Sequence, residues 1–416
     1  MNKLIERIKI TDKFILFIYF YMFVMPWNFE KSQMGILTGI LLIWWLIRFK
    51  SQFLEKLKTL FEFKPLVILI VFIVYTYISV LWSDSFKEGF EHVNQFHKYY
   101  FFIIPLLFTS LNKEEAIQVF KVLIISFGFY GLFSIFIYLD LITINETNSN
   151  SSNPKGIMAY AIMSTYMAIG SLCALFIAYY EKNKKQQMFF LIIALLCTIA
   201  LFINKGRTAQ LSFILTGITI VILYAKHFLF KLKYFLFLFI IIVLSFCVLY
   251  FSGKIDRYNN ALNEIKEIVI QNEYKGSTGV RIYFYKAGLE IIKDNFFFGM
   301  GPEDNIRLLQ KIQENDKEYL SNTIYASFHS QHLDTLTRYG LIGYLLLILS
   351  GVYLLYKLKI CKEIYFVALP FFLVTFYTSL ANVMLIKKPF NYVYISVFVL
   401  FSIIAYLMQQ KKLQHD

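Results

Sequence analysis

The chain has 416 residues, of which 58% are hydrophobic, 19% aromatic and only 16% charged. Because soluble domains carry about 25% charged residues, these proportions exclude a soluble globular protein and indicate an integral membrane protein. The formal net charge of +14 would suggest a nucleic-acid partner in a soluble protein. In a membrane protein, lysine and arginine instead gather in the cytoplasmic loops, so we expect membrane lipids and no nucleic acid as partners.

Twelve apolar segments follow one another along the chain, each close to the roughly 20 residues that a helix needs to cross the hydrocarbon core. They cover residues 14–28, 34–48, 65–82, 97–111, 117–141, 157–180, 188–203, 208–225, 232–252, 339–357, 363–385 and 390–408. The pattern predicts an all-α integral membrane protein with about twelve transmembrane helices. The first segment lacks a small-residue cleavage site, so we expect no cleaved signal peptide.

The distribution of basic residues orients these segments. With the N-terminus in the cytoplasm, an even number of crossings makes both termini cytoplasmic. More than half of the 41 lysine and arginine residues then lie in cytoplasmic segments, as the positive-inside rule requires. We therefore expect three parts: helices one to nine over residues 1–252, a periplasmic cap over 253–338, and the last three helices with a cytoplasmic tail over 339–416.

The stretch 253–338 has the pattern of a small helical cap. The apolar residues of VRIYFYKAGLEIIK, residues 280–293, recur at helical spacing, which predicts a helix. They are Ile282, Tyr285, Leu289 and Ile292. A turn rich in glycine and aromatic residues, NFFFGMGPEDN, and an amphipathic helix over 303–321 follow. Ser327 is positioned to cap the helix that runs into the membrane.

Two cations stand at the outer start of a predicted membrane helix, in NKGRTAQLSF. Arg207 opens the helix and Lys205 precedes it. The free N–H groups and the dipole of a helix N-terminus favour an anion at the same place, so one interpretation is anion binding. The alternative is that both side chains extend to the lipid headgroups.

Arg281, in STGVRIYFYKAG, lies near the start of the aromatic helix of the cap. Its guanidinium can bind phosphate oxygens through two parallel hydrogen bonds, which lysine cannot do. A phosphate-binding role is therefore one interpretation. The other is a structural salt bridge to Glu290 or to another carboxylate of the cap.

Two histidines occur in SFHSQHLDTLTRYGLIG, where the chain enters the tenth predicted membrane segment. On a helix that starts near Phe328, one face carries His329, Leu333, Leu336, Gly340 and Gly343. The glycines would let a neighbouring helix approach closely, with His329 at the outer mouth of this face. Histidine titrates near neutral pH and suits a general base, and a structural histidine is the alternative. His332 is offset and is the secondary candidate.

A metal site requires more ligands than this region offers. A zinc ion needs about three protein ligands, and the other histidines expected outside are His92 and His97. All the cysteines lie in or beside apolar segments; they are Cys173, Cys197, Cys247 and Cys361. We therefore expect no metal and no other cofactor. Two arginines beside a proton acceptor then suit the transfer of a group from a lipid-linked diphosphate.

In order and spacing, these features resemble the WaaL-like O-antigen ligase family of the wider O-antigen ligase/polymerase superfamily. The family pattern is a histidine, a leucine four residues on, and a Gly-Leu-Ile-Gly run. It is matched by His329, Leu333 and residues 340–343. The chain departs from the pattern at Ser330, where many members have asparagine, and at His332, where an aromatic residue is common.

The upstream motifs of the family are matched in the same order, by LWSDS at 81–85, GRTAQL with Arg207, and Arg281 before DNFFFGMGPEDN. The resemblance implies a GT-C-type glycosyltransferase of the bacterial inner membrane, which we expect to be a monomer. Such an enzyme transfers a glycan from undecaprenyl diphosphate to a sugar hydroxyl of lipid A–core on the periplasmic side, in lipopolysaccharide biosynthesis. By resemblance, Arg207 and Arg281 bind the diphosphate and His329 accepts the hydroxyl proton. The reaction is then one inverting displacement without metal or nucleotide.

Three other functions stay open at this point. An O-antigen polymerase uses the same donor with a second lipid-linked glycan as acceptor, and a protein O-oligosaccharyltransferase belongs to the same superfamily. Polymerases often carry two sizeable outer loops, whereas the second loop here, residues 145–156, is short and plain, which favours a ligase. A lipid or solute transporter would place charged residues at the membrane midplane, and the centres of the apolar segments are almost free of charge.

Overall fold

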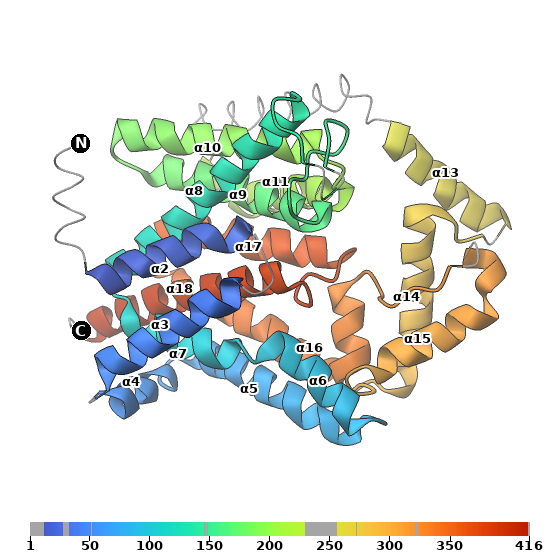
Figure 1. Ribbon diagram of the computed structural model, residues 1–416, viewed down its shortest axis with the longest axis horizontal. Helices are drawn as coiled ribbons and strands as arrows, with labels where there is room; N and C mark the ends of the chain where they lie inside the picture. Colours follow the sequence, from blue (N-terminus) through green and yellow to red (C-terminus); the bar gives the residue numbers. More distant parts are fainter. Residues whose placement is uncertain are drawn as a thin grey trace.

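The computed structural model describes residues 12–27, 33–50, 52–144, 147, 149–228, 256–271, 273–320 and 323–414. Within these ranges the chain is built of helices, and the bridges between extended residues are two isolated ones near residues 144–153. The all-α class predicted from the sequence is therefore confirmed (Figure 1).

Most of the helices coincide with predicted membrane segments. The helices are α2 (Lys13–Val24), α3 (Gln33–Phe49), α4 (Phe53–Leu60), α5 (Lys64–Ile78), α6 (Phe86–His97), α7 (Tyr100–Ser110), α8 (Lys113–Tyr138), α9 (Tyr160–Tyr180), α10 (Lys184–Ile203), α11 (Arg207–Phe228), α13 (Asp256–Gln271), α14 (Gly276–Asp294), α15 (Asp304–Asn315), α16 (Gln331–Leu358), α17 (Lys362–Ser379) and α18 (Lys388–Leu413). The predicted segment 232–252 lies outside the described residues, and each of the others coincides with a helix.

Length and composition identify the helices that can cross a membrane. In the described part of the chain, seven are long and apolar enough, or eight if α3 and α4, which meet at a bend of 116°, form one span. Short 3₁₀ turns extend two of the apolar helices: η1 (Met25–Trp27) follows α2, and η2 (Ser79–Trp82) follows α5. The chain is thus a multi-pass membrane protein, as its composition predicts.

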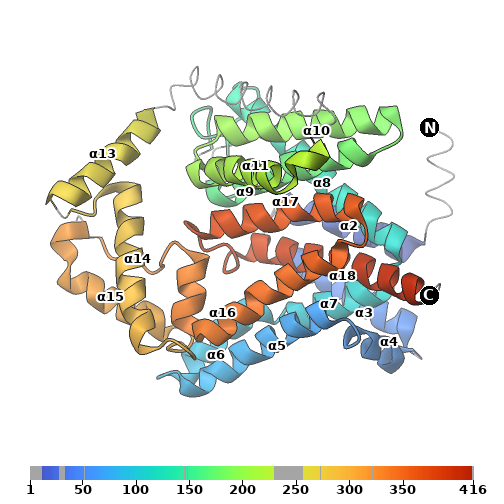
Figure 2. The ribbon, with the colours of Figure 1, turned by 180° about the vertical axis from the view of Figure 1, so that it is seen from behind.

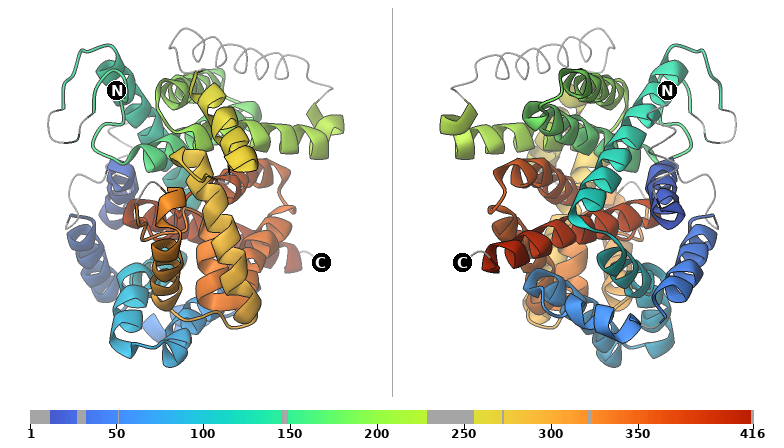
Figure 3. Two further views of the ribbon diagram at one scale, coloured as in Figure 1. Left: turned by 90° about the vertical axis from the view of Figure 1, so that its right-hand side faces the viewer. Right: turned by 90° about the vertical axis from the view of Figure 1, so that its left-hand side faces the viewer.

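Three groups of helices are stacked across the bundle (Figures 1 and 3). Helices α3–α7 lie on one side and α9–α11 on the other, with α17 and α18 between them. The most buried are α9 and α18, since 89% of the apolar window of each lies inside the protein. A stack of the rings of Phe127, Tyr166 and Phe390 joins α8, α9 and α18. Gly170 of α9 faces Phe127 and Cys197, and its lack of a side chain lets α8 and α10 approach closely.

A second hydrophobic cluster forms a cap at one end of the bundle, and the C-terminus lies near the other end (Figures 1 and 2). The cap contains α13, α14, α15 and the turn η3 (Lys317–Leu320), all within the predicted stretch 253–338. The helix predicted over residues 280–293 is confirmed as part of α14, although Ile282 and Leu289 of its apolar stripe are exposed. The adjacent rings of Tyr283 and Phe284 are buried instead, since aromatic rings bury more apolar surface.

The predicted start of α16 is wrong by three residues. The N-cap is Ser330, whose hydroxyl accepts a hydrogen bond from a first-turn N–H at 3.3 Å. Ser327 instead accepts one from the N–H of His329 at 3.1 Å. His329 has a φ of +49° and precedes the helix, and α16 is interrupted again at Gly340, with a φ of +64°. The predicted face from His329 to Gly343 is therefore not one continuous helical face.

Candidate functional site

The turn between α10 and α11 holds Lys205 and Arg207 in place. The buried Asn204 donates a hydrogen bond from its side-chain amide to the Pro154 carbonyl at 3.2 Å. Gln210, in the first turn of α11, donates to the Asn204 carbonyl at 3.1 Å. The polar residues of NKGRTAQ thus fix this turn against the loop that precedes α9, and α11 begins at Arg207 as predicted.

Both arginines predicted for the site hydrogen-bond to Ser277, at the start of α14. Arg207 donates from Nη2 to the Ser277 hydroxyl. Arg281 donates from Nη1 to the Ser277 carbonyl and from Nε to the Ala381 carbonyl, the latter at 3.1 Å. Within the described residues, the hydrogen-bond partners of Arg281 are therefore carbonyls. The predicted alternative, a salt bridge to Glu290, is not formed.

Arg207, Arg281 and Lys205 line one cavity of about 340 Å³. It is enclosed by the starts of α9, α11 and α14 and by the loop that follows α17. No carboxylate is among the described residues that line it. The starts of α11 and α14 add the positive ends of two helix dipoles. Cations from two separate sequence motifs thus meet in one cavity.

The pKa of Arg281 reflects this crowding of positive charge. Burial is the largest cause that lowers the pKa of the guanidinium, and the charge of Arg207 lowers it further, while Tyr160 and Glu264 act in the opposite direction. A bound anion would favour the charged form of both arginines. The cavity therefore has the electrostatics of an anion-binding site.

His329 precedes α16 in the left-handed backbone region, a costly conformation that is frequent at functional sites. Its ring stacks on Phe284 of α14, with centroids 5.6 Å apart and planes inclined by 14°, and it meets the ring of Tyr325 edge-on. Burial lowers the pKa of His329, and the charges of Arg281 and Lys387 lower it further. The imidazole is therefore neutral at pH 7 and can accept a proton.

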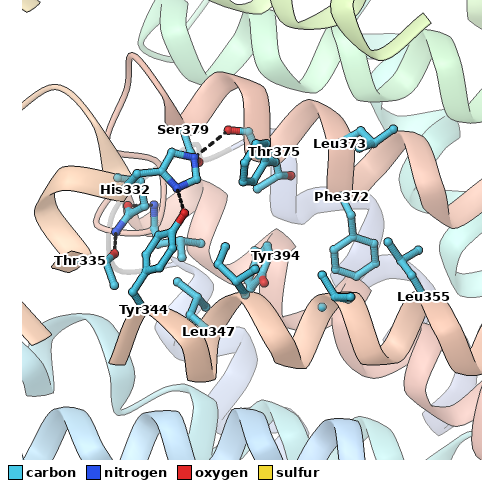
Figure 4. A pocket seen from close by; sticks show the side chains of 16 residues that line it. His332, Thr335, Tyr344, Leu347, Leu355, Phe372, Leu373, Thr375, Ser379 and Tyr394 are labelled. Atoms are coloured by element: carbon cyan, nitrogen blue, oxygen red, sulfur yellow. Dashed lines mark hydrogen bonds between the residues drawn. The ribbon is translucent and has the colours of Figure 1, made fainter. Parts of the chain in front are cut away.

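His332 differs from His329 because both of its ring nitrogens have protein partners (Figure 4). Nε2 donates to the Phe376 carbonyl of α17 at 3.1 Å, and Nδ1 accepts from the Tyr344 hydroxyl at 3.1 Å. His332 lines a separate, mainly apolar cavity of about 150 Å³ between α16 and α17. The Phe376 bond ties α16 to α17, and the Tyr344 bond joins residues on either side of the break in α16. The geometry therefore favours a structural role for His332 and leaves His329 as the candidate base.

The turn DNFFFGMGPEDN hydrogen-bonds to α16 at the point where the helix is interrupted. Backbone hydrogen bonds of 2.8 to 3.2 Å join residues 296–301 of the turn to residues 337–342 of the helix. They pair carbonyls and N–H groups that the break would otherwise leave free. A Cβ at Gly340 would overlap a carbonyl of the turn, so this glycine is needed for the break. Gly343, in contrast, faces the Tyr75 ring of α5, as the prediction of close helix approach requires.

A buried cluster of charges lies beside this turn, and the sequence analysis missed it. Arg338 is only 1% exposed and donates to Asp334 at 2.8 Å. Arg338 also donates to His92 of α6 and lies 3.5 Å from Glu303, which bonds to His92 in turn. The cluster joins α6, the turn and α16. Its signal in the sequence was the i,i+4 spacing of Asp334 and Arg338, since charges that enter a membrane segment are usually paired.

The hydrogen-bond partners of His92 determine which of its ring nitrogens carries the proton. Arginine offers only donors, so Nε2 of His92 accepts from Arg338, and Nδ1 carries the proton and donates to Glu303. Burial and the charge of Arg338 lower the pKa of His92. The hydrogen bond from His92 is the largest cause that lowers the pKa of Glu303, to about 2. His92 is thus a structural residue.

The described residues contain no group of three His, Cys, Asp or Glu side chains that could hold a metal ion.

The fold and the site together define a class of protein: a multi-pass, all-α membrane protein with a helical cap and a cationic cavity at the cap end. Residues 191–348 match the family model described as O-Antigen ligase. The match runs from α10 into α16 and contains every residue predicted for the site. Residues 191–348 are thus an O-antigen ligase domain, which supports membership of the O-antigen ligase superfamily, as the motifs predict, while the WaaL-like branch remains a prediction.

One curated relative is an uncharacterized protein of Haemophilus influenzae, strain Rd. It is 28% identical to the chain over 174 residues, which cover 41% of this chain and 43% of the relative. The similarity thus spans less than half of either protein. It carries no statement about activity.

Proposed function

We propose that the protein is an O-antigen ligase of the bacterial inner membrane, with both termini in the cytoplasm and the cap in the periplasm. It transfers a glycan from undecaprenyl diphosphate to a sugar hydroxyl of lipid A–core. The observation that carries this proposal is the convergence of Arg207, Arg281 and Lys205 on one cavity. A diphosphate has the charge and the oxygen geometry that such a cavity binds.

In this proposal the arginines act on the leaving group. Carbonyl bonds from Ser277 and Ala381 orient the guanidinium of Arg281 without neutralising it. One of its terminal nitrogens, Nη2, has no hydrogen-bond partner within the described residues and can donate to a phosphate oxygen. As the bond between the sugar and the diphosphate breaks, negative charge grows on the departing oxygen. Preorganised cations stabilise that charge and so lower the barrier.

The proton acceptor in this proposal is His329. The acceptor hydroxyl gives its proton to the neutral imidazole, and its oxygen forms a bond to the anomeric carbon of the glycan. The bond from that carbon to the diphosphate oxygen breaks in the same step, so the configuration at the carbon is inverted. The charge of Arg281 lowers the pKa of His329, which indicates that base and diphosphate site lie within electrostatic reach.

The loop before α9 supports a ligase over a polymerase. Its described residues do not form a second outer domain but pack on the bundle. The Pro154 carbonyl accepts from Ser134 at 2.6 Å and from Asn204 at 3.2 Å, and the Lys155 carbonyl accepts from Tyr130 at 3.0 Å. The loop thus supports the turn that carries Arg207.

Reconstitution tests the proposal. The purified full-length protein would receive undecaprenyl-diphosphate glycan together with either lipid A–core or a second lipid-linked glycan. We expect glycan on lipid A–core, and none with His329→Ala. Elongation of the lipid-linked glycan instead would make the protein a polymerase, and no product from either acceptor, with the donor intact, would contradict the proposed activity.

A further inference from the structure

A second large cavity lies at the end of the bundle opposite to the cap. Its volume is about 510 Å³, and it is bordered by the start of α2, the end of α3, α4, the turn between α7 and α8, and the last part of α18. In Figure 2 these elements surround the C-terminal end of the molecule, far from α14 and α15. None of its lining residues belongs to the candidate site, so its role is independent of the proposed glycan transfer.

Two cations line this cavity and contact the same aromatic ring. The Arg48 guanidinium carbon and the Lys56 ammonium nitrogen lie 5.5 and 4.4 Å from the centre of the Phe49 ring. Lys56 uses one of its three N–H groups to donate a hydrogen bond to the Thr109 carbonyl, at 3.1 Å. Arg48 bonds to Asp12 and retains further donors. Both cations can therefore donate to phosphate oxygens in the cavity.

Two carboxylates balance these cations. Asp12 and Glu115 line the same cavity. Glu115 accepts a hydrogen bond from the Asn112 N–H at 2.8 Å through one oxygen of its carboxylate, and the second oxygen can accept a bond from a ligand. The described lining thus carries equal numbers of positive and negative side chains. Charge complementarity then favours a ligand with one negative and one positive group over a purely anionic one.

The surroundings of the cavity are those of a membrane interface. Helix α4 turns away from α3 by 116° and exposes Leu54 and Phe61, which are 73% and 64% accessible. A short amphipathic helix with exposed apolar side chains and lysines is typical of a segment lying at the headgroup level. Phe108 and Ile403 add apolar lining. The Ser110 hydroxyl, also in the lining, has no hydrogen-bond partner in the described part of the chain.

We propose that this cavity binds the headgroup of a zwitterionic aminophospholipid, of the phosphatidylethanolamine class, from the leaflet opposite to the cap. The phosphate lies between Arg48 and Lys56, and the ammonium group faces Glu115. The acyl chains follow the apolar side of the cavity into the bilayer. The bound lipid fixes α4 and the ends of α3 and α7 to the membrane surface.

Native mass spectrometry of the delipidated full-length protein tests this inference. Short-chain phosphatidylethanolamine, phosphatidylglycerol and inorganic phosphate would be titrated separately. We expect phosphatidylethanolamine to bind about tenfold more tightly than phosphatidylglycerol, since a complementary charge pair gains about 1.4 kcal/mol or more, and inorganic phosphate to bind weakly. Equal affinity for the two lipids, or equally tight binding of inorganic phosphate, would overturn the proposal.

Matched variants locate the site. Lys56→Gln should weaken phosphatidylethanolamine binding about tenfold, whereas Lys58→Gln, on the same helix but outside the cavity lining, should leave it unchanged. Glu115→Gln keeps a side chain that can serve the helix cap, and it should shift the preference towards phosphatidylglycerol. Unchanged lipid affinity in Lys56→Gln, with an unaltered melting temperature, would contradict the assignment.

Discussion

The arginines at the cap end of the bundle occupy two different environments. Arg281 bonds to carbonyls and Arg207 to a hydroxyl, in a cavity whose described lining has no carboxylate. Arg338 is buried and bonded to Asp334 and His92. The difference indicates how to separate binding arginines from structural ones. A buried arginine with carboxylate partners, such as Arg338, holds the fold together, whereas Arg281, whose hydrogen-bond partners are carbonyls, keeps a charge that an anion can neutralise.

The largest expected effect follows from removing the candidate base. His329→Ala should lower glycan transfer by about 10²–10⁴-fold, the usual contribution of a general base, without a change in melting temperature. The rate of transfer by purified protein measures this. His332→Gln is the matched control and should lose less than about tenfold, because both ring nitrogens of His332 bond to protein groups within α16 and α17. Comparable losses in both variants would contradict the assignment of the base to His329 and of a structural role to His332.

The next largest effect concerns the guanidinium group of Arg207, which can donate two parallel hydrogen bonds to a phosphate. Arg207→Lys keeps the charge but loses bidentate hydrogen bonding, and should reduce transfer by about 10²-fold, as removal of one preorganised donor does. Single-turnover rates with saturating donor measure the effect on the chemical step. A rate near that of the unmodified protein would show that Arg207 only contacts lipid headgroups.

For the structural arginine we expect the reverse pattern. Arg338→Met leaves Asp334 and Glu303 without their cation and should lower the free energy of unfolding by about 3–5 kcal/mol. Transfer per folded molecule should change much less than in Arg207→Lys. Thermal unfolding in detergent, together with activity normalised to folded protein, measures both quantities. An unaltered melting temperature would argue against the charge cluster as a structural element.

The smallest effect concerns pH. Neutral His329 is the active form, and the charge of Lys387 helps to lower its pKa. Activity should therefore fall as the pH drops through this lowered pKa, and Lys387→Gln should move the acid limb of the pH–rate profile to higher pH. Lys388→Gln, an exposed neighbour of the same charge, should leave the limb in place. If the acid limb moved equally in both variants, the titrating group would not be His329.

Much of this arrangement could be predicted from the sequence. Long apolar segments predict helices because a membrane leaves few other structures possible. The site cations Arg207 and Arg281 were identified by their position at helix starts on the outer side. The structure brings both into one cavity, although they are far apart in the chain. These predictions depend on the local residue pattern and on the side of the membrane that each loop faces, and both can be inferred from the sequence.

The errors and omissions have a common physical cause, since each depends on bonds between distant segments. The turn at residues 296–301 pairs with α16 and interrupts it at Gly340, which no helical periodicity reveals. His329 takes a left-handed conformation stacked on Phe284 of another helix. The cluster around Arg338 needs His92 from a segment more than 200 residues earlier. Local sequence patterns contain none of these pairings.

Direct binding of a lipid diphosphate tests the central claim most directly, because it depends on the cavity and not on the acceptor. The affinity of the purified protein for a short-chain polyprenyl diphosphate would be compared with that of Arg281→Gln and of Lys293→Gln, an exposed cation on the same helix. We expect about tenfold or greater weakening for Arg281→Gln, since a charge-assisted bidentate contact is lost, and no change for Lys293→Gln. Equal affinity of all three proteins would contradict the account.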